Sequence, residues 1–422
     1  MQILKPVLDR CSANLQRFSF RLGYNSTIHA QDEEAQEEKE EEVERKGTGD
    51  PLVGLKEMDL AFNTPSFLSN LHFLKRCIQV EELRVHIIDI VLAESLKTFS
   101  RLKKLHINNF DNVSAGFISS ALPHLPKLDT FHVGSEDFQH PVTDRQLADL
   151  LSASRLGWRS IRLPSLNSLA AEVLILKHCP TLEELVVEQS LDMSSAQMRH
   201  ILSSGPRLHT FVTLLEGGLA GSKVPHFVAK DFIDLDSASN SLKPWKCESS
   251  LRVFHAKILS IPRSDVTTDR HGFPREDVLQ ETYPGQTQEL QSQVYQRLAR
   301  FTHLEKLGLG HDDRDLGFVH GGYIDDVDGN YVFGDSYYQY DCLEMTLKSG
   351  LGILEGLKKL NELNVMRMTT RIGVDEVKWM RRNWPNLQTI IGLDIRGNEM
   401  EAAQWLKEEC PQVKSTPYVV GR

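Results

Sequence analysis

The sequence predicts an α/β solenoid in which short parallel strands alternate with helices. Three observations predict this fold: an apolar motif recurs along the chain, its copies lie about 25 residues apart, and helical signals fall between them. A unit of one strand and one helix cannot bury its apolar side alone, so such units stack on their neighbours. We expect residues 1–422 to form a single solenoid, a curved arc with parallel strands on its concave face and helices on its convex face.

The repeated motif has the form apolar-x-x-apolar-x-apolar. Its alternating end is typical of a short strand with one face buried. From Leu55 to Leu208 the intervals between copies are 25, 22, 26, 30, 24 and 26 residues, close to the ~20–29-residue period of leucine-rich repeats. The copies begin at Leu15, Leu55, Val80, Leu102, Leu128, Trp158, Leu182, Leu208, Leu251, Leu304 and Leu360, with weaker copies at Leu387 and Val413.

Helix signals occupy the stretches between the motifs. Thr143 and Gln146 have the spacing of a capping box, in which two side chains satisfy the free backbone groups at a helix start. Ser194 or Ser195 can cap a second helix, and Asn398 a third. Apolar residues at helical spacing predict a fourth helix before the Leu304 motif. These residues are Leu290, Val294, Leu298 and Phe301.

Four segments interrupt the period and are expected to be insertions on the solenoid: residues 23–51, 215–246, 258–286 and 310–340. The first contains an acidic run, which we expect to be disordered or a solvated helix extension. In the last, Asp328-Gly329 predicts a hairpin turn between Tyr323-Ile324 and Tyr331-Val332-Phe333. The aromatic residues of this insertion suit either an interface or packing against the solenoid itself.

Charge is concentrated in one place. The chain has 58 acidic and 48 basic residues and a net charge of −10. Nine of the acids and one lysine lie between Asp32 and Glu44, so the remainder carries a net charge of −2. This near-neutral remainder argues against nucleic-acid binding. No apolar stretch approaches the ~18 residues needed to span a bilayer, and the amino terminus lacks a secretory apolar core. We therefore expect a soluble monomer, cytoplasmic or nuclear, without membrane contact.

The sequence contains no recognisable catalytic or cofactor motif. Six cysteines stand apart without zinc or redox spacing. Cys77, Cys179 and Cys410 each lie three residues before a motif, where a small apolar thiol can pack. Residues 325–330 are acidic but do not have the calcium-loop spacing. We expect no enzyme activity, cofactor or metal. The competing hypothesis, an enzyme or metal site in the carboxyl-half insertions, requires a converging His/Asp/Cys set.

Residues between the buried positions of each strand should face outward and form the candidate site. Because parallel strands lie ~4.8 Å apart, His106 and His132 should be close neighbours. Three interpretations remain open: a basic, pH-sensitive strip that binds a partner, a solvated surface without a role, and a metal site lacking a third ligand. The candidate partner-binding residues are Arg84, Lys104, His106, His132, Arg162, Glu184, Val186 and Glu188, and His255 continues the central outward position.

Several motifs resemble the cysteine-containing, ribonuclease-inhibitor-like leucine-rich repeats of F-box proteins, most closely those of fungi. They are Cys179-Pro-Thr-Leu182-Glu-Glu-Leu185, Trp384-Pro-Asn-Leu387 and Cys410-Pro-Gln-Val413. In that family an amino-terminal F-box docks on the adaptor of a cullin-based ubiquitin ligase, and the repeats capture the substrate. No F-box is visible before the Leu15 motif, so adaptor binding is expected only if an F-box exists. The resemblance implies a non-enzymatic protein-interaction scaffold, either the substrate-recognition part of a ligase subunit or a ligase-independent scaffold.

Overall fold

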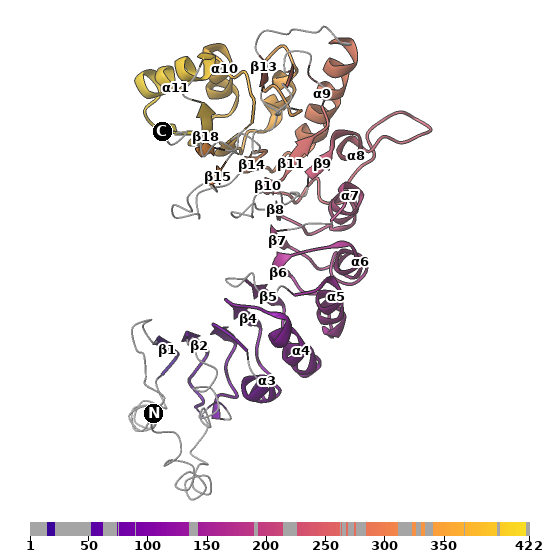
Figure 1. Cartoon of the computed structure of the whole chain (residues 1–422), viewed down its shortest axis with the longest axis vertical. Helices are drawn as coiled ribbons and strands as arrows, with labels where there is room; N and C mark the ends of the chain where they lie inside the picture. The colour runs from indigo at the N-terminus through magenta and orange to yellow at the C-terminus, as the bar shows by residue number, and fades with distance from the viewer. Residues whose placement is uncertain are drawn as a thin grey trace, which may run out of the picture. The chain divides into compact units, whose positions relative to one another are not determined.

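The computed structural model describes the parts of the chain that carry the repeat motifs (Figure 1). The described residues are 15–21, 52–61, 74, 76–88, 90–134, 142–189, 193–213, 226–261, 263, 267–268, 274–275, 284–310, 323–325, 331–333, 341–366, 368–394 and 397–418. The acidic run at 32–44 lies outside them. Among the described helices, none combines the length and the apolar character needed to cross a membrane.

In the described part of the chain, thirteen parallel strands form one open sheet and follow one another in chain order. The strands are β1 (Arg17–Arg21), β2 (Glu57–Ala61), β3 (Glu82–Val85), β4 (Lys104–Ile107), β5 (Thr130–Val133), β6 (Ser160–Ser165), β7 (Glu184–Gln189), β8 (Thr210–Thr213), β10 (Val253–His255), β14 (Lys306–Gly308), β17 (Glu362–Asn364), β18 (Thr389–Asp394) and β19 (Lys414–Tyr418). Each predicted copy of the motif coincides with one of these strands. The fold is an α/β leucine-rich-repeat solenoid, as predicted.

The chain divides into two compact units. The first comprises Met1–Pro164 with Leu176–His178, and the second comprises Ser165–Ile175 with Cys179–Arg422. In the first unit, α3 (Ile90–Leu96), α4 (Asn112–Ala121) and α5 (Asp144–Ala153) follow strands β3, β4 and β5. These helices lie on one face of the strands (Figure 1), and we call the opposite face the outward face.

The core of the first unit is built from the three apolar positions of each motif. Leu83, Leu105 and Phe131, at the middle position, are fully buried. Phe131 stacks on Trp158 with ring centroids 4.7 Å apart, and Trp158 packs on His178 at 4.9 Å. Because inward residues alternate with outward ones along each strand, burial of the motif fixes which side chains face outward.

In the second unit, β8 and β10 carry phenylalanine at the middle inward position. Phe211 and Phe254 stack with centroids 6.1 Å apart, and Phe254 stacks on Phe301 at 6.0 Å. The helices here are α7 (Ser195–Ser204), α9 (Pro284–Ala299), α10 (Val374–Asn383) and α11 (Gly397–Glu409), while α6 (Ser168–Lys177) follows β6. Val294 and Leu298 on α9 are buried, as their helical spacing predicts.

The predicted insertion at 215–246 contains regular structure in its described part. β9 (His226–Val228) pairs in parallel with β11 (Lys257–Leu259) and leads into α8 (Ala229–Ile233). The fully buried Arg297 of α9 holds this segment: its guanidinium lies 2.8 Å from the Glu248 carboxylate and donates to the Ile233 carbonyl at 2.6 Å. The same guanidinium lies 4.3 Å from the Trp245 ring. Arg297, whose charge is paired with that of Glu248, thus joins the segment to the solenoid core.

Two predicted helix caps are confirmed and one is wrong. Thr143 with Gln146 and Ser194 with Gln197 both form capping boxes. Asn398 lies inside α11, which already includes Gly397, so it does not cap that helix. Favourable capping chemistry indicates a nearby helix start without fixing its first residue.

The antiparallel strand pairing predicted in the 310–340 insertion is confirmed. β15 (Tyr323–Asp325) and β16 (Tyr331–Phe333) pair antiparallel, with Asp325 opposite Tyr331. The turn residues Asp328 and Gly329 lie outside the described part of the chain. A second short antiparallel pair, β12 (Thr267–Thr268) with β13 (Pro274–Arg275), lies in the 258–286 insertion.

Candidate functional site

Outward-facing side chains of β1 to β6 form two rows that run across the strands of the first unit. The strand register aligns residues of one row directly with one another. The first row is Arg17, Glu57, Glu82, Lys104, Thr130 and Ser160, and the second row is Ser19, Asp59, Arg84, His106, His132 and Arg162. Predicted neighbours on the outward face are therefore true neighbours in the sheet.

Glu82 is the centre of charge in these rows. Its carboxylate accepts hydrogen bonds from Arg84 Nε at 2.9 Å and Nη2 at 2.8 Å, and lies 3.3 Å from Lys104 Nζ. Partial burial by itself would raise the pKa of Glu82, but the hydrogen bonds from Arg84 and Lys104 outweigh it and hold this pKa below its ordinary value. Glu82 is therefore ionised at neutral pH and shared by two cations.

Sequence reasoning did not single out Glu82. A signal was present, because Glu82 precedes Arg84 by two residues on the same strand, and side chains two apart point to the same face. The arginine and the glutamate therefore had to be neighbours on that face. The sequence-based prediction did not consider ion pairs between residues two apart on one strand, and so it omitted Glu82.

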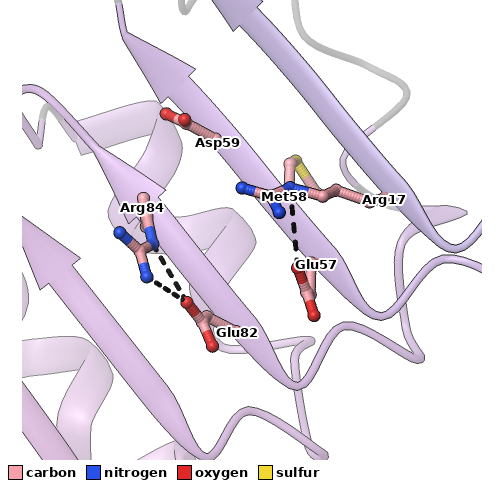
Figure 2. A pocket seen from close by; sticks show the side chains of 6 residues that line it. All are labelled: Arg17, Glu57, Met58, Asp59, Glu82 and Arg84. Carbon is pink, nitrogen blue, oxygen red and sulfur yellow. Dashed lines mark hydrogen bonds and ion pairs between the residues drawn. The ribbon is translucent and has the colours of Figure 1, made fainter.

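Across β1, β2 and β3 the outward face is a shallow depression with charged walls. Figure 2 shows its lining side chains, which are Arg17, Glu57, Met58, Asp59, Glu82 and Arg84. Arg17 Nε lies 3.6 Å from the Glu57 carboxylate, and Ser19 donates to Asp59 at 3.4 Å. The two carboxylates on β2, Glu57 and Asp59, outnumber the cation of Arg17 on β1, whereas Arg84 and Lys104 lie on β3 and β4.

His106 and His132 meet edge to face at the centre of the second row. Their ring centroids lie 4.8 Å apart at an interplanar angle of 83°, which confirms the predicted proximity. His132 Nε2 shares a 2.7 Å hydrogen bond with Ser160 Oγ. His106 Nε2 is buried 3.8 Å from Glu82, beyond hydrogen-bonding distance.

Protonation of His106 is suppressed. Burial is the main cause, and the neighbouring His132 and Arg84 add to it, so that the pKa of His106 falls to about 4 despite the opposing effect of Glu82. The ring is therefore neutral at pH 7. The predicted basic character thus resides in Arg84, Lys104 and Arg162 rather than in this histidine.

The remaining predicted site residues lie on β7. Glu184 on β7 is partly exposed and belongs to the second unit, as does Val186, which is only 8% exposed and offers little surface to a partner. The side chain of Glu188 lies outside the described residues. Arg84, Lys104, His106, His132 and Arg162 are the predicted residues that one unit brings together, and we call these five the basic strip.

In the second unit, His255 does not face outward into solvent as predicted. Its ring is buried, and Nε2 lies 2.9 Å from the Gly310 carbonyl. Gly308, aligned with it on β14, makes this possible, because a Cβ there would lie 2.4 Å from the His255 ring. Asn364 and Ile391 at the same position are also buried. Gly308 was the sequence signal that a neighbouring side chain would occupy this position.

The packing interpretation of the cysteines is confirmed where they are described. Cys77, Cys179 and Cys410 are buried. Burial raises the pKa of Cys77 to about 12, partly offset by Arg76, and raises that of Cys179 to about 12. Such thiols stay protonated and are poor nucleophiles or metal ligands. Within the described ranges, no group of three or more His, Cys, Asp or Glu side chains is placed to hold a metal ion.

Comparisons with known proteins add little to this geometry. No protein-family model matches the chain, and no curated protein matches it. Among solved structures, the chain is similar to one in the crystal structure of the Rad7 and Elc1 complex in yeast. The alignment has 15% sequence identity and a TM-score of 0.43, and covers 87% of this chain and 81% of that chain.

Proposed function

We propose that the chain is a non-enzymatic protein-interaction scaffold that binds a partner through the basic strip. The observation that carries this proposal is the strand register, which aligns Arg84, His106, His132 and Arg162 on four adjacent strands. Rigid strands hold these side chains in a fixed order, and the apolar core behind them fixes their direction. A surface of this kind suits recognition of another chain better than enclosure of a small molecule.

The exposure of the strip supports binding. The side chains of Arg84 and Lys104 are each 52% exposed, so both can reach a partner while their charged ends contact Glu82. Arginine is favoured in protein interfaces because its planar group forms several directed hydrogen bonds at once. The strip thus combines a rigid base with accessible donor groups.

The 2.7 Å contact between His132 and Ser160 raises the alternative that these two residues are a catalytic base and nucleophile. A serine nucleophile needs a base that is itself oriented by a third group, together with donors for the developing oxyanion. Here the ring of His132 meets the edge or face of His106, and the serine hydroxyl completes the row of outward residues. We interpret the contact as a hydrogen bond between neighbouring residues of the two outward-facing rows. Covalent labelling of Ser160 by a fluorophosphonate probe would contradict the non-enzymatic proposal.

A double charge reversal tests the proposed surface. We expect Arg84→Glu with Arg162→Glu to abolish recovery of partner proteins from native lysate, while the melting temperature stays within about 2 °C because both side chains lie outside the core. The matched control is Arg145→Glu on α5, a 77% exposed arginine on the helix side of the same unit. Equal recovery by the double variant and the control would show that the strip does not bind the partner.

A finer proposal concerns the class of assembly. The motifs beginning at Cys179 and Cys410 support a role in substrate recognition for an F-box-type ubiquitin ligase, since they resemble repeats of that family. Affinity capture with the full chain should then recover the ligase adaptor and a cullin. Recovery of partners without either ligase component would favour the ligase-independent scaffold.

A further inference from the structure

We propose that β1 is a docking edge, at which an extended segment of a partner protein adds a strand to the sheet. The added strand pairs antiparallel with β1 through the backbone groups of Arg17, Ser19 and Arg21. This inference goes beyond the proposed function, because it depends on backbone groups at the end of the sheet and not on the side chains of the basic strip.

The backbone of β1 presents unused hydrogen-bonding groups on one side. Among the described strands β1 has one neighbour, β2. The carbonyl of Gln16, directly before β1, faces β2 and accepts a hydrogen bond from the Glu57 N–H at 3.1 Å. Because backbone groups alternate between the two sides of a strand, those of Arg17 and Ser19 point away from β2. Among the described residues, none donates to or accepts from these groups on that side.

The opposite end of the sheet is protected in a way that β1 is not. In the last strand, β19, the Lys414 N–H donates to the Gln388 carbonyl next to β18 at 2.7 Å. By the same alternation Pro417, three residues on, stands at the free edge, and proline has no N–H to offer. Proline is one of the devices that keep sheet edges from pairing. The strand Arg17–Arg21 contains no proline, so its edge keeps its donors.

A second copy of the chain does not fit the β1 edge. Antiparallel pairing of two β1 strands about Ser19 would place Arg17 of each copy opposite Arg21 of the other, and like charges directly opposite are destabilising. Pairing of β1 with β19 of another copy would meet the missing N–H of Pro417. A strand of a different protein has neither obstacle, and we therefore assign the edge to a partner.

The inward face of β1 predicts an apolar residue in the added strand. Phe18 lies at the inward position in register with Met58. Met58, with a strand on either side, is 1% exposed, whereas Phe18 is partly exposed. An apolar residue opposite Phe18 would extend the buried row by one strand.

The outward face of β1 adds a weaker preference for an acidic residue. The side chain of Arg17 is 67% exposed and lies 3.6 Å from Glu57 on the β2 side (Figure 2). An acidic residue opposite Arg17 can contact it from the other side, whereas lysine there would meet a like charge. Because Glu57 and Asp59 lie only one strand further away, we expect this charge preference to be small and the backbone pairing to dominate.

Binding of synthetic peptides to the full chain tests the proposal. The probe is a fluorescent heptapeptide, Thr-Glu-Val-Thr-Val-Glu-Thr, whose central threonine pairs with Ser19. Its control carries an N-methyl group on that threonine and so cannot donate to the Ser19 carbonyl. We expect the N-methyl peptide to bind about fivefold more weakly, as the loss of one backbone hydrogen bond predicts.

A proline at Ser19 makes the matched change in the protein. Ser19→Pro removes an N–H from the free edge and leaves the hydrogen bonds to β2 in place. Ser19→Ala keeps this N–H and, like the proline variant, loses the hydroxyl contact with Asp59. We expect Ser19→Pro to bind the probe weakly and to recover less partner from lysate, while Ser19→Ala keeps the preference between the two peptides. Both variants should melt within about 2 °C of the wild-type chain.

Four results would overturn the inference. Equal binding of the two peptides to the wild-type chain would exclude backbone pairing. Self-association of the chain that Ser19→Pro abolishes would assign the edge to a second copy. Peptide binding seen only after deletion of residues 32–44 would assign it to the chain's own acidic run. If Ser19→Pro recovers partner as the wild-type chain does while the double charge reversal does not, the docking-edge inference falls and the proposed function stands.

Discussion

His178 in the first unit is a buried residue whose packing determines its protonation state. Its Nδ1 accepts a hydrogen bond from the Trp158 backbone N–H at 2.9 Å, and its Nε2 donates to the Leu151 carbonyl at 3.1 Å. This pattern requires the neutral ring with its proton on Nε2. Burial lowers the pKa of His178 to about 4, although the bond to Leu151 opposes the shift.

The buried His178 predicts acid sensitivity of the fold. Between a folded pKa of about 4 and an unfolded value of ~6.5 the unfolded chain binds more protons, so this contribution is present above pH ~6.5 and is lost as pH falls toward 4. We expect His178 to account for a loss of about 2 kcal/mol in the free energy of unfolding between pH 7.5 and 5.0. Urea unfolding at both pH values measures it.

The control for this prediction is the exposed His200 on α7. His178→Gln should lower stability at pH 7.5 and flatten its dependence on pH, whereas His200→Gln should change neither. His106, whose pKa is also lowered, contributes in the same direction and stays constant across the variants. An unchanged pH dependence in His178→Gln would refute the assignment.

At the scale of elements, Gly308 on β14 leaves room for the ring of His255 on the neighbouring strand β10. A Cβ at Gly308 would overlap the His255 ring and displace it from the Gly310 carbonyl. We expect Gly308→Ala to destabilise the fold by about 1–3 kcal/mol, as overpacking does. In a His255→Ala background the same substitution should cost much less, because the obstructing ring is gone.

Thermal unfolding measures this coupling. Gly116→Ala is the control, since a Cβ at that helical position meets no atom within 4 Å, and it should be neutral or slightly stabilising. Additive effects of the Gly308 and His255 substitutions would show that the two residues are not coupled.

Elements were predictable where one local pattern decided them. The strands follow from the alternation in each motif, and the helices that begin after Thr143 and Ser194 follow from their capping boxes. Asn398 misled because a capping residue type is also tolerated within a helix. The strands β9 and β11 pair although both come from segments that interrupt the repeat. The repeat period gives no information about pairing between such segments.

For the whole molecule, the repeat predicted both the sheet and the neighbours of the candidate site. The contact between His106 and His132 followed from motif phase alone, because the phase sets the strand register. Burial at the outward positions of the second unit did not follow, since the motif specifies only which residues face inward. Val186 and His255 were therefore assigned to an open surface that the structure does not give them.

The central claim is that the basic strip binds the partner, and a binding isotherm with a recovered partner tests it most directly. The partner should be titrated against the wild-type chain, the Arg84→Glu/Arg162→Glu variant and the Arg145→Glu control at one ionic strength. We predict at least a tenfold rise in Kd for the double variant and no change for the control. Wild-type affinity in the double variant, with its fold intact, would contradict the account.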